Sequence, residues 1–179
     1  MKNIFVVLLI AAALTACTKT EETEIERHID GPKVEKAIAS LHGLGDNKVD
    51  GIVTFEQTPE GVKVDAKING LSNSKHGFHI HQYGDCTAED GTSAGGHFNP
   101  DNMEHSGPEA MKRHMGDMGN LQGAGENAVS TISYTDKTIS LSEILGRGVI
   151  IHAGTDDLKS QPSGAAGPRI SCGVIGITK

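Results

Sequence analysis

Residues 51–68 read GIVTFEQTPEGVKVDAKI, two runs of alternating apolar and polar residues joined by the turn sequence TPEG. A period of two sends successive side chains to opposite faces of a strand, and Pro and Gly between two such runs favour a hairpin. Similar short runs lie elsewhere in the chain, at KAIASLH, AVSTISY, TISLS, RGVIIH and SCGVIGI. Because no segment keeps a helical period for long, the pattern predicts an all-β domain of about eight strands in a sandwich or barrel.

The N-terminal stretch MKNIFVVLLIAAALTAC has the pattern of an export signal. One lysine precedes an apolar run that is too short to span a bilayer, and small residues follow it. The segment Leu14-Thr15-Ala16-Cys17 resembles the lipobox of bacterial lipoproteins, in which cleavage precedes the cysteine and its thiol is acylated. We therefore expect a signal peptide at 1–16 and a lipid anchor on Cys17, the alternative being an ordinary signal peptide with an incidental cysteine.

Residues 17–33 read CTKTEETEIERHIDGPK, an acidic stretch without hydrophobic periodicity, and we expect a flexible tether there. One domain then occupies 34–179. Removing Lys2 with the signal leaves 15 basic and 23 acidic residues, so the formal net charge changes from −7 to about −8. This balance disfavours nucleic acid and anionic lipid as partners, and an anionic substrate would need a locally positive site.

The cysteine count fits an exported protein. Once Cys17 is assigned to lipid, Cys86 and Cys172 remain of the three cysteines. In an oxidising compartment such a pair is most simply a disulfide. A metal–thiolate site is the alternative, although two cysteines far apart in sequence do not particularly suggest one.

Histidines gather in and after the stretch HGFHIHQYGDC, residues 76–86. If this stretch is extended, His79 and His81 lie on one face and can bind the same ion. A loop rich in Gly, Pro, Asp and His runs from about Tyr83 to Asn120, and a loop of that length needs a reason, which metal binding would supply. The loop and a later strand end add candidate ligands suited to copper or zinc: His97, His105, His114, Asp117 and His152.

One short helical turn is expected within this loop, around residues 109–115, where Met111, Met115 and Met118 fall at helical spacing. Thioethers are soft copper ligands, but apolar packing is the better interpretation of these three side chains. The metal hypothesis therefore rests on imidazole and carboxylate groups.

Several long motifs together resemble copper-zinc superoxide dismutase over nearly the whole of 34–179: GFHIHQYGDC, GGHFNP, HFNPDNMEHSGPEAMKRHMGDMGN, VIIHAGTDDL and GAAGPRISCGVIGI. The resemblance implies an eight-stranded Greek-key β-barrel or sandwich with long metal-binding loops. It also implies copper and zinc as cofactors and superoxide as substrate. Copper would alternate between Cu(II) and Cu(I), which zinc cannot do, and the products would be oxygen and hydrogen peroxide.

The resemblance implies two ligand sets that share one histidine. Copper is expected on His79, His81, His97 and His152. Zinc is expected on His97, His105, His114 and Asp117. The shared imidazole of His97 would leave copper on reduction and take a proton, Asp156 would hydrogen-bond to a ligand of each metal, and Arg169 would attract the anion beside copper. His76 matches a structural histidine of the family and is not expected on a metal.

Two features depart from the eukaryotic members of that family. Cys86 directly follows Gly84-Asp85, a placement that resembles the bacterial exported branch. Only LKSQPSGAAGP separates Asp157 from Arg169, so the family's electrostatic loop is short and Lys159 is its one cation. A homodimer is among the expected partners, but the two branches pair differently, so the interface and the other steering residues stay open.

The resulting hypothesis is a lipid-anchored enzyme of the cell envelope that protects it from extracytoplasmic superoxide. A copper- and zinc-binding lipoprotein that buffers metal without turnover is the main alternative, and the retained Arg169 opposes it. A copper-only relative is opposed by the four zinc-matching residues. An adhesion-type sandwich would leave the histidines unexplained.

Overall fold

The computed structural model describes residues 33–179, so the expected signal peptide, Cys17 and the tether up to residue 32 lie outside the described residues. The described chain contains eight strands: β1 (Lys36–Gly43), β2 (Asp50–Thr58), β3 (Gly61–Asn69), β4 (Lys75–His81), β5 (Asp117–Gln122), β6 (Ser130–Asp136), β7 (Gly148–His152) and β8 (Arg169–Ile177). A 3₁₀ turn (Thr92–Ala94) and a short helix, α1 (Leu141–Ile144), lie in the connections. Within residues 33–179 no helix is long and apolar enough to cross a membrane.

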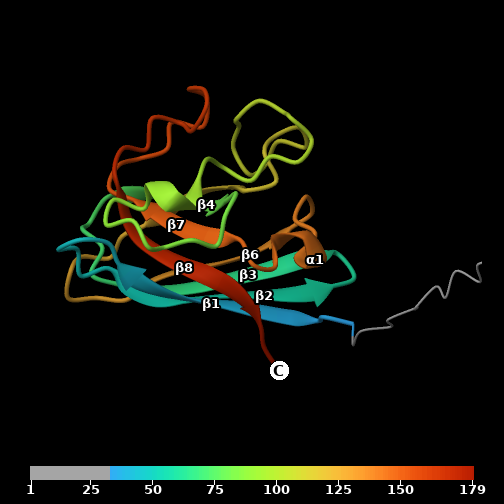
Figure 1. The fold of residues 1–179 in the computed structure, drawn as a ribbon, viewed down its shortest axis with the longest axis horizontal. Helices are drawn as coiled ribbons and strands as arrows, with labels where there is room; N and C mark the ends of the chain where they lie inside the picture. The colour runs from blue at the N-terminus through green and yellow to red at the C-terminus, as the bar shows by residue number, and fades with distance from the viewer. Residues whose placement is uncertain (1–32) are drawn as a thin grey trace, which may run out of the picture. The chain divides into compact units, whose positions relative to one another are not determined.

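All strand pairs are antiparallel, and the sheet order is β5-β4-β7-β8-β1-β2-β3-β6. The sheet curls until its two end strands, β5 and β6, contact each other, which nearly closes a barrel (Figure 1). The β2–β3 hairpin turns as the sequence predicts, with Thr58 opposite Gly61. Because β3 pairs with β6 and β4 with β7, the chain crosses between non-adjacent strands, as in a Greek-key barrel. The predicted fold class is confirmed.

The barrel interior follows the alternation of the sequence. In β3 the side chains of Val62, Val64 and Ile68 are fully buried, whereas the lysines and the aspartate between them are at least partly exposed. Phe55 and Phe78 lie in the same core cluster. Burying side chains of this size contributes about 1.5–3 kcal/mol each.

Strand β4 differs from the others because every residue from His76 to His81 is buried. Phe78 and Ile80 belong to the core cluster. The alternate residues, His79 and His81, therefore lie on the opposite face of the strand, which the long loops cover. This strand connects the hydrophobic core to the histidine-rich part of the molecule.

The run TISLS, residues 138–142, is not the strand that its sequence predicts. The carboxylate of Asp136 accepts hydrogen bonds from the N–H groups of Thr138 and Ile139, at 2.8 and 3.1 Å, and thereby ends β6 in a tight turn. Helix α1 follows directly. The eighth strand is instead β5, which begins at Asp117 inside the stretch expected to be irregular.

The prediction of a helical turn around residues 109–115 was also wrong, because the chain there forms separate turns and bends. The side chain of Arg113 determines this course: it is 3% exposed, and its Nη2 donates to both carboxylate oxygens of Asp136 at 2.6 Å. Met115 and Met118 pack in the core as predicted. Met111 does not, since it is 75% exposed.

Candidate metal centre

Main-chain pairing places His97 beside the end of β4. The N–H of Gln82 donates to the carbonyl of Gly96 at 2.9 Å, and the N–H of Phe98 donates to the carbonyl of Ile80 at 2.8 Å. The loop therefore runs antiparallel to β4 for a few residues around an isolated bridge between His81 and His97. Two candidate ligands from different segments are thus held next to each other by backbone hydrogen bonds.

The start of β5 is brought to the same place by Gly116. Its carbonyl accepts from the N–H of Ile80, and its N–H donates to the carbonyl of Phe98, both at 2.9 Å. A Cβ at Gly116 would lie 2.1 Å from the carbonyl oxygen of Ile80, so only glycine permits this approach. The next residue, Asp117, is consequently placed against His97.

The first group of candidate ligands, called here the four-histidine cluster, consists of His79, His81, His97 and His152. One ring nitrogen of each lies within 4.8 Å of those of the others. Nδ1 of His79 and Nε2 of the other three are buried and have no hydrogen-bond partner. Because buried polar atoms without partners are costly, four of them facing one point indicate a site that can hold an ion, and imidazole suits copper.

The second group, called the mixed cluster, consists of His97, His105, His114 and Asp117. The three Nδ1 atoms lie 2.8, 2.9 and 3.1 Å from Oδ1 of Asp117. The other carboxylate oxygen is occupied, because it accepts from the N–H groups of Ser106 and His114 at 3.1 Å each. Three imidazoles and one carboxylate oxygen form a donor set that fits tetrahedral zinc.

His97 belongs to both clusters. Its side chain is only 2% exposed, its Nδ1 faces Asp117, and its Nε2 has no hydrogen-bond partner. Its ring centroid lies 4.0 Å from that of His79 and 5.3 Å from that of His105. The geometry thus gives one imidazole a nitrogen in each ligand set.

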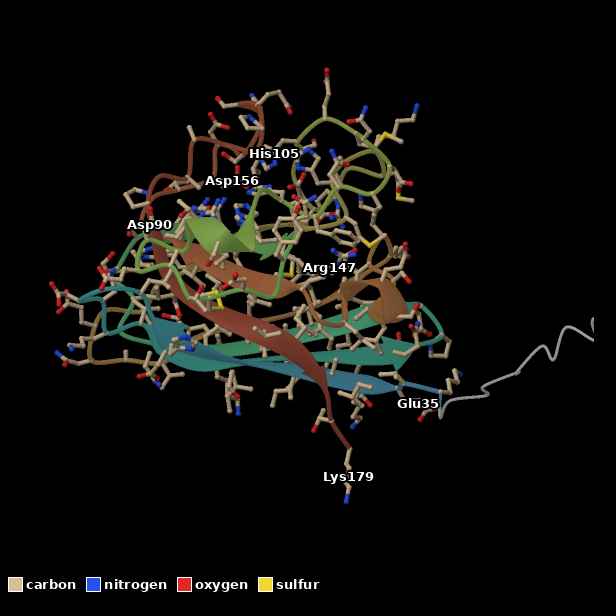
Figure 2. All side chains as sticks on the ribbon, in the orientation of Figure 1. Glu35, Asp90, His105, Arg147, Asp156 and Lys179 are labelled. Carbon is tan, nitrogen blue, oxygen red and sulfur yellow. A yellow bond between two sulfur atoms is a disulfide. The ribbon has the colours of Figure 1, made fainter. Side chains whose placement is uncertain are left out.

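The non-ligand nitrogens are also held. Oδ2 of Asp156 lies 2.8 Å from Nε2 of His79, and Oδ1 lies 2.9 Å from Nε2 of His105. Figure 2 shows Asp156 and His105 near each other in the loops above the barrel. The amide of Asn120 holds this aspartate in turn, because its Nδ2 donates to the carbonyl of Asp156 and its Oδ1 accepts from the N–H. Nδ1 of His152 lies 3.0 Å from the carbonyl of Gly167. Such partners fix the tautomer and orientation of a metal-binding imidazole.

Burial keeps the four-histidine cluster neutral in the metal-free chain. It lowers the pKa of His79 to about 3 and that of His152 to about 4, and it also lowers the pKa of His81 and His97. Burial alone would lower the pKa of His105 too, but its hydrogen bonds to Asp117 and Asp156 outweigh burial and raise that pKa to about 9. Neutral imidazole is the form that binds one metal ion, so His79, His81 and His152 are ready to bind without losing a proton. His97 would have to lose its remaining N–H proton to serve both clusters.

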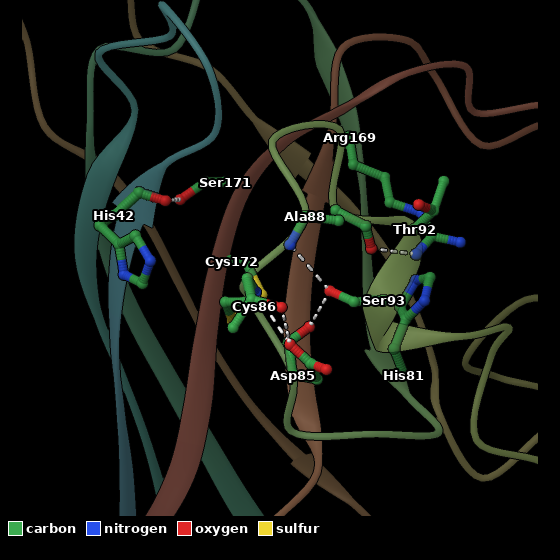
Figure 3. The surroundings of a disulfide bond; sticks show 12 residues. His42, His81, Asp85, Cys86, Ala88, Thr92, Ser93, Arg169, Ser171 and Cys172 are labelled. Carbon is green, nitrogen blue, oxygen red and sulfur yellow. Dashed lines mark hydrogen bonds between the residues drawn. A yellow bond between two sulfur atoms is a disulfide. The ribbon is translucent and has the colours of Figure 1, made fainter.

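Arg169 begins β8 at the edge of the four-histidine cluster. Its guanidinium is half-buried and donates to the carbonyl oxygens of Gly91 and Gly95, at 2.5 and 2.6 Å. The same loop is tied to β8 by a disulfide between Cys86 and Cys172 (Figure 3). The predicted disulfide is therefore confirmed, and the thiolate alternative is wrong.

His76 lies apart from both clusters. Its Nδ1 is 2.9 Å from the carbonyl of His152, and its Nε2 is 3.1 Å from the hydroxyls of Ser72 and Ser74. It links the start of β4 to the end of β7, which agrees with the structural role expected for it.

Sequence reasoning missed three residues whose side chains brace the loops: Arg113, Asn120 and Gln161. No motif or regular spacing in the sequence distinguishes them.

Fold and site together define a β-barrel metalloprotein with two adjoining ion sites that share an imidazole. The copper/zinc superoxide dismutase family model matches residues 49–175. The extracellular copper-zinc superoxide dismutase of Drosophila melanogaster is 40% identical over an alignment of 191 positions, gaps included, which covers 99% of each chain. The copper-zinc enzymes of Xenopus laevis (form A) and Schizosaccharomyces pombe are 45% and 44% identical, each covering 79% of this chain and 97% of the relative.

Among solved structures, the crystal structure of the clock protein EA4 superposes with a TM-score of 0.75 at 38% identity and covers 84% of this chain and 99% of that chain. The chain belongs to the copper/zinc superoxide dismutase family. Its cofactors are accordingly copper and zinc, and its reaction is the dismutation of superoxide.

Proposed function

We propose that this chain is an exported, lipid-anchored enzyme that dismutates superoxide with copper in the four-histidine cluster and zinc in the mixed cluster. The observation that carries the assignment is His97, whose two nitrogens serve the two clusters while its side chain is buried. When bound, copper supplies the reversible one-electron redox change that the reaction needs and that zinc lacks.

The protein's own residues then have separate tasks. His79, His81 and His152 present one free nitrogen each, because the other nitrogen is held by Asp156 or by a main-chain carbonyl. Nε2 of His97 can hold a proton whenever it is not bound to metal. Arg169 supplies a fixed positive charge and hydrogen-bond donors for an anion.

The direct test is metal analysis and a dismutation assay on the purified chain. We expect about one copper and one zinc per chain and a rate near the diffusional range. Stoichiometric metal without turnover would instead support the buffering lipoprotein, and zinc without any copper would overturn the enzymatic proposal. His81→Ala should lose copper and activity while the barrel stays folded, because β4 is held by its neighbours and the core.

Export and anchoring rest on the N-terminal pattern. The disulfide agrees with an oxidising compartment, and one relative 40% identical to this chain is named extracellular. We propose a signal peptide at 1–16, acylation of Cys17, a tether at 17–33 and the enzyme at 34–179, in the manner of the bacterial lipoprotein branch. Cys17→Ser should release the protein from membranes. Sedimentation of that variant with membranes would indicate another anchor.

We also propose a homodimer, with its interface on the exposed apolar side chains at the start of the loop that contains Cys86. Tyr83 and Val174 are 53% and 43% exposed, and Gly84 brings their segments together, since a Cβ there would lie 2.8 Å from Cγ1 of Val174. Exposed apolar groups that adjoin often mark an interface. Val174→Glu should convert a dimer to a monomer in sedimentation equilibrium, whereas a wild-type monomer would overturn the proposal.

A further inference from the structure

The loop after β7 touches the mixed cluster through a side chain that no metal motif includes. The N–H of His105 donates to Oε1 of Gln161 at 2.8 Å, and Nε2 of Gln161 donates to the carbonyl of His105 at 3.0 Å. The two residues are 56 positions apart in sequence. One amide side chain therefore pairs with both main-chain groups of a candidate zinc ligand.

The same loop also closes over the ring of His105. Gly164 has φ +66°, and a Cβ there would lie 1.7 Å from Oδ1 of Asp156 and 2.7 Å from Nε2 of His105. The loop folds back on itself through the N–H of Asp157, which donates to the carbonyl of Gly164 at 2.9 Å. Residues 156–164 thus contact His105 at its Nε2, its N–H and its carbonyl, which leaves Nδ1 to face Asp117.

His105 depends on this contact more than the other members of the mixed cluster do. His97 forms a bridge with His81 at the end of β4, and His114 directly follows Arg113, which is tied to Asp136. His105 lies in neither a strand nor a helix. In the part of the chain that the structure describes, its main-chain N–H and carbonyl pair with Gln161 alone.

We infer that Gln161 is a positioning residue for zinc: it holds the main chain of His105 in place, so that zinc retention requires the loop of residues 156–164 to be closed. The inference rests on the proposed zinc assignment of the mixed cluster. Asn120 pairs in the same two-bond manner with the main chain of Asp156. Two amide side chains therefore fix the two residues whose side chains meet at Nε2 of His105.

The experiment compares Gln161→Ala and Gln161→Glu with a matched control, Gln57→Ala, in the full chain. Gln57 is another exposed glutamine whose Nε2 donates to main-chain carbonyls, those of Thr58 and Gly61, but it lies at the β2–β3 turn. Release of zinc and of copper to a chelator is measured separately. Hydrogen exchange of the His105 amide is followed in the metal-free and the loaded protein.

Gln161→Ala should release zinc about tenfold faster than wild type, with copper release and melting temperature close to those of the control, because groups that orient metal ligands typically change affinity on this scale. Exchange of the His105 amide should accelerate in the same variant. Gln161→Glu keeps an acceptor for that amide but cannot donate to the carbonyl. It should therefore preserve the amide's protection and recover only part of the zinc retention.

Three results would overturn the inference. Unchanged zinc release from zinc-loaded Gln161→Ala would mean that the pair does not position the ligand. Equal acceleration of zinc and copper release, together with a lower melting temperature, would mean a general structural role. A wild-type chain that takes up no zinc would overturn the zinc assignment itself, and this is distinguishable because it is seen before any variant is compared.

Discussion

His81 and Arg169 share one hydrogen-bond acceptor, the carbonyl oxygen of Gly95. Nδ1 of His81 lies 2.9 Å from it, and Nη2 of Arg169 lies 2.6 Å from it. With Nδ1 engaged, the free nitrogen of His81 is Nε2, which faces the rest of the four-histidine cluster. Arg169, which we propose attracts the substrate, and a ligand of the proposed copper site are thus placed by the same peptide group.

Arg169→Glu should lower the second-order rate with superoxide by at least about tenfold while copper content stays constant, because steering by local charge acts on this scale. The decrease of the rate with added salt should also shrink or reverse, since exposed charges are screened over about 8 Å at physiological ionic strength. Arg169→Lys should keep part of the rate, because the charge remains and the forked donors are lost.

Lys179→Glu is the control for this series, because it changes the net charge equally at the opposite end of the barrel from His105 (Figure 2). Dismutation rates of the metal-loaded variants are compared from low to high ionic strength. A wild-type rate that does not change with salt would show that Arg169 does not guide the substrate. Equal effects of Arg169→Glu and Lys179→Glu on the rate would show the same.

Asp156→Ala should weaken the binding of both copper and zinc, since one carboxylate orients a ligand of each cluster. Loss of such a partner typically costs about 10- to 100-fold in metal affinity. Asp157→Asn is the matched control, because the neighbouring carboxylate accepts from Lys159 and Ser160 instead. Chelator competition measures the dissociation constants, and unchanged zinc affinity in Asp156→Ala would contradict the expectation.

The metal-free chain should lose stability in acid. Burial lowers the pKa of His79 to about 3 and of His152 to about 4, whereas both titrate near 6.5 when unfolded. Below pH 6.5 the unfolded state binds more protons than the folded state. The free energy of unfolding therefore decreases as the pH is lowered, by up to about 1.4 kcal/mol per pH unit for each such histidine. His105 acts oppositely: its pKa is raised to about 9, so its stabilisation is lost as pH rises from 6.5 towards 9.

Urea unfolding of the metal-free chain between about pH 5 and about pH 9 measures this dependence. We expect a maximum near neutral pH and a steeper fall on the acid side, where several histidines act together. The metal-loaded chain is the control, because ligated nitrogens do not titrate until the metal leaves. A free energy of unfolding that is constant between neutral and mildly acid pH would count against neutral, buried imidazoles.

What could be predicted from the sequence was local. The hairpin in residues 51–68 and the shared face of His79 and His81 depend only on alternation within one strand. The strand β5 was missed because its sequence, DMGNLQ, has little β-branched character and is stabilised by pairing with β4. The run TISLS has strand composition, but the carboxylate of Asp136 competes for its N–H groups.

The bracing residues could not be predicted for a different reason. Gln161 and Asn120 pair with main-chain groups 56 and 36 positions away, and nothing in the neighbouring residues indicates those partners. Ligand histidines are recognisable because a metal restricts residue type and spacing. An amide that pairs with a peptide group can stand anywhere the fold brings the two together.

Reduction of the Cys86–Cys172 disulfide should lower the free energy of unfolding by about 2–4 kcal/mol, because the bond restricts the unfolded chain across a separation of 86 residues. Urea unfolding with and without reductant measures the change. The double variant Cys86→Ala/Cys172→Ala is the control, since its stability should not respond to reductant. An equal stability of oxidised and reduced wild type would contradict the expectation.

The final prediction concerns Asp90, an exposed carboxylate beside Arg169. The next residue, Gly91, packs on the Arg169 side chain and accepts its hydrogen bond. Hydrogen bonds from Thr92 are the main cause that lowers the pKa of Asp90, and the charge of Arg169 adds a smaller effect in the same direction, so the two charges interact. Superoxide is an anion, and a carboxylate here weakens the local attraction. Asp90→Asn should therefore raise the second-order rate roughly 1.5- to 3-fold at low ionic strength, as expected for one exposed charge.

The chain contains a matched control for this change. Asp85 accepts from the N–H and hydroxyl of Thr87 at 2.9 and 2.7 Å, as Asp90 does from Thr92 at 3.0 and 2.7 Å. Asparagine can accept the same bonds, so either variant keeps its turn and changes the net charge equally. Only Asp90→Asn should accelerate dismutation, and its advantage should vanish near 1 M salt, where screening acts within about 3 Å. Equal rates for the two variants at low salt would show that net charge, and not the position of Asp90, sets the encounter rate.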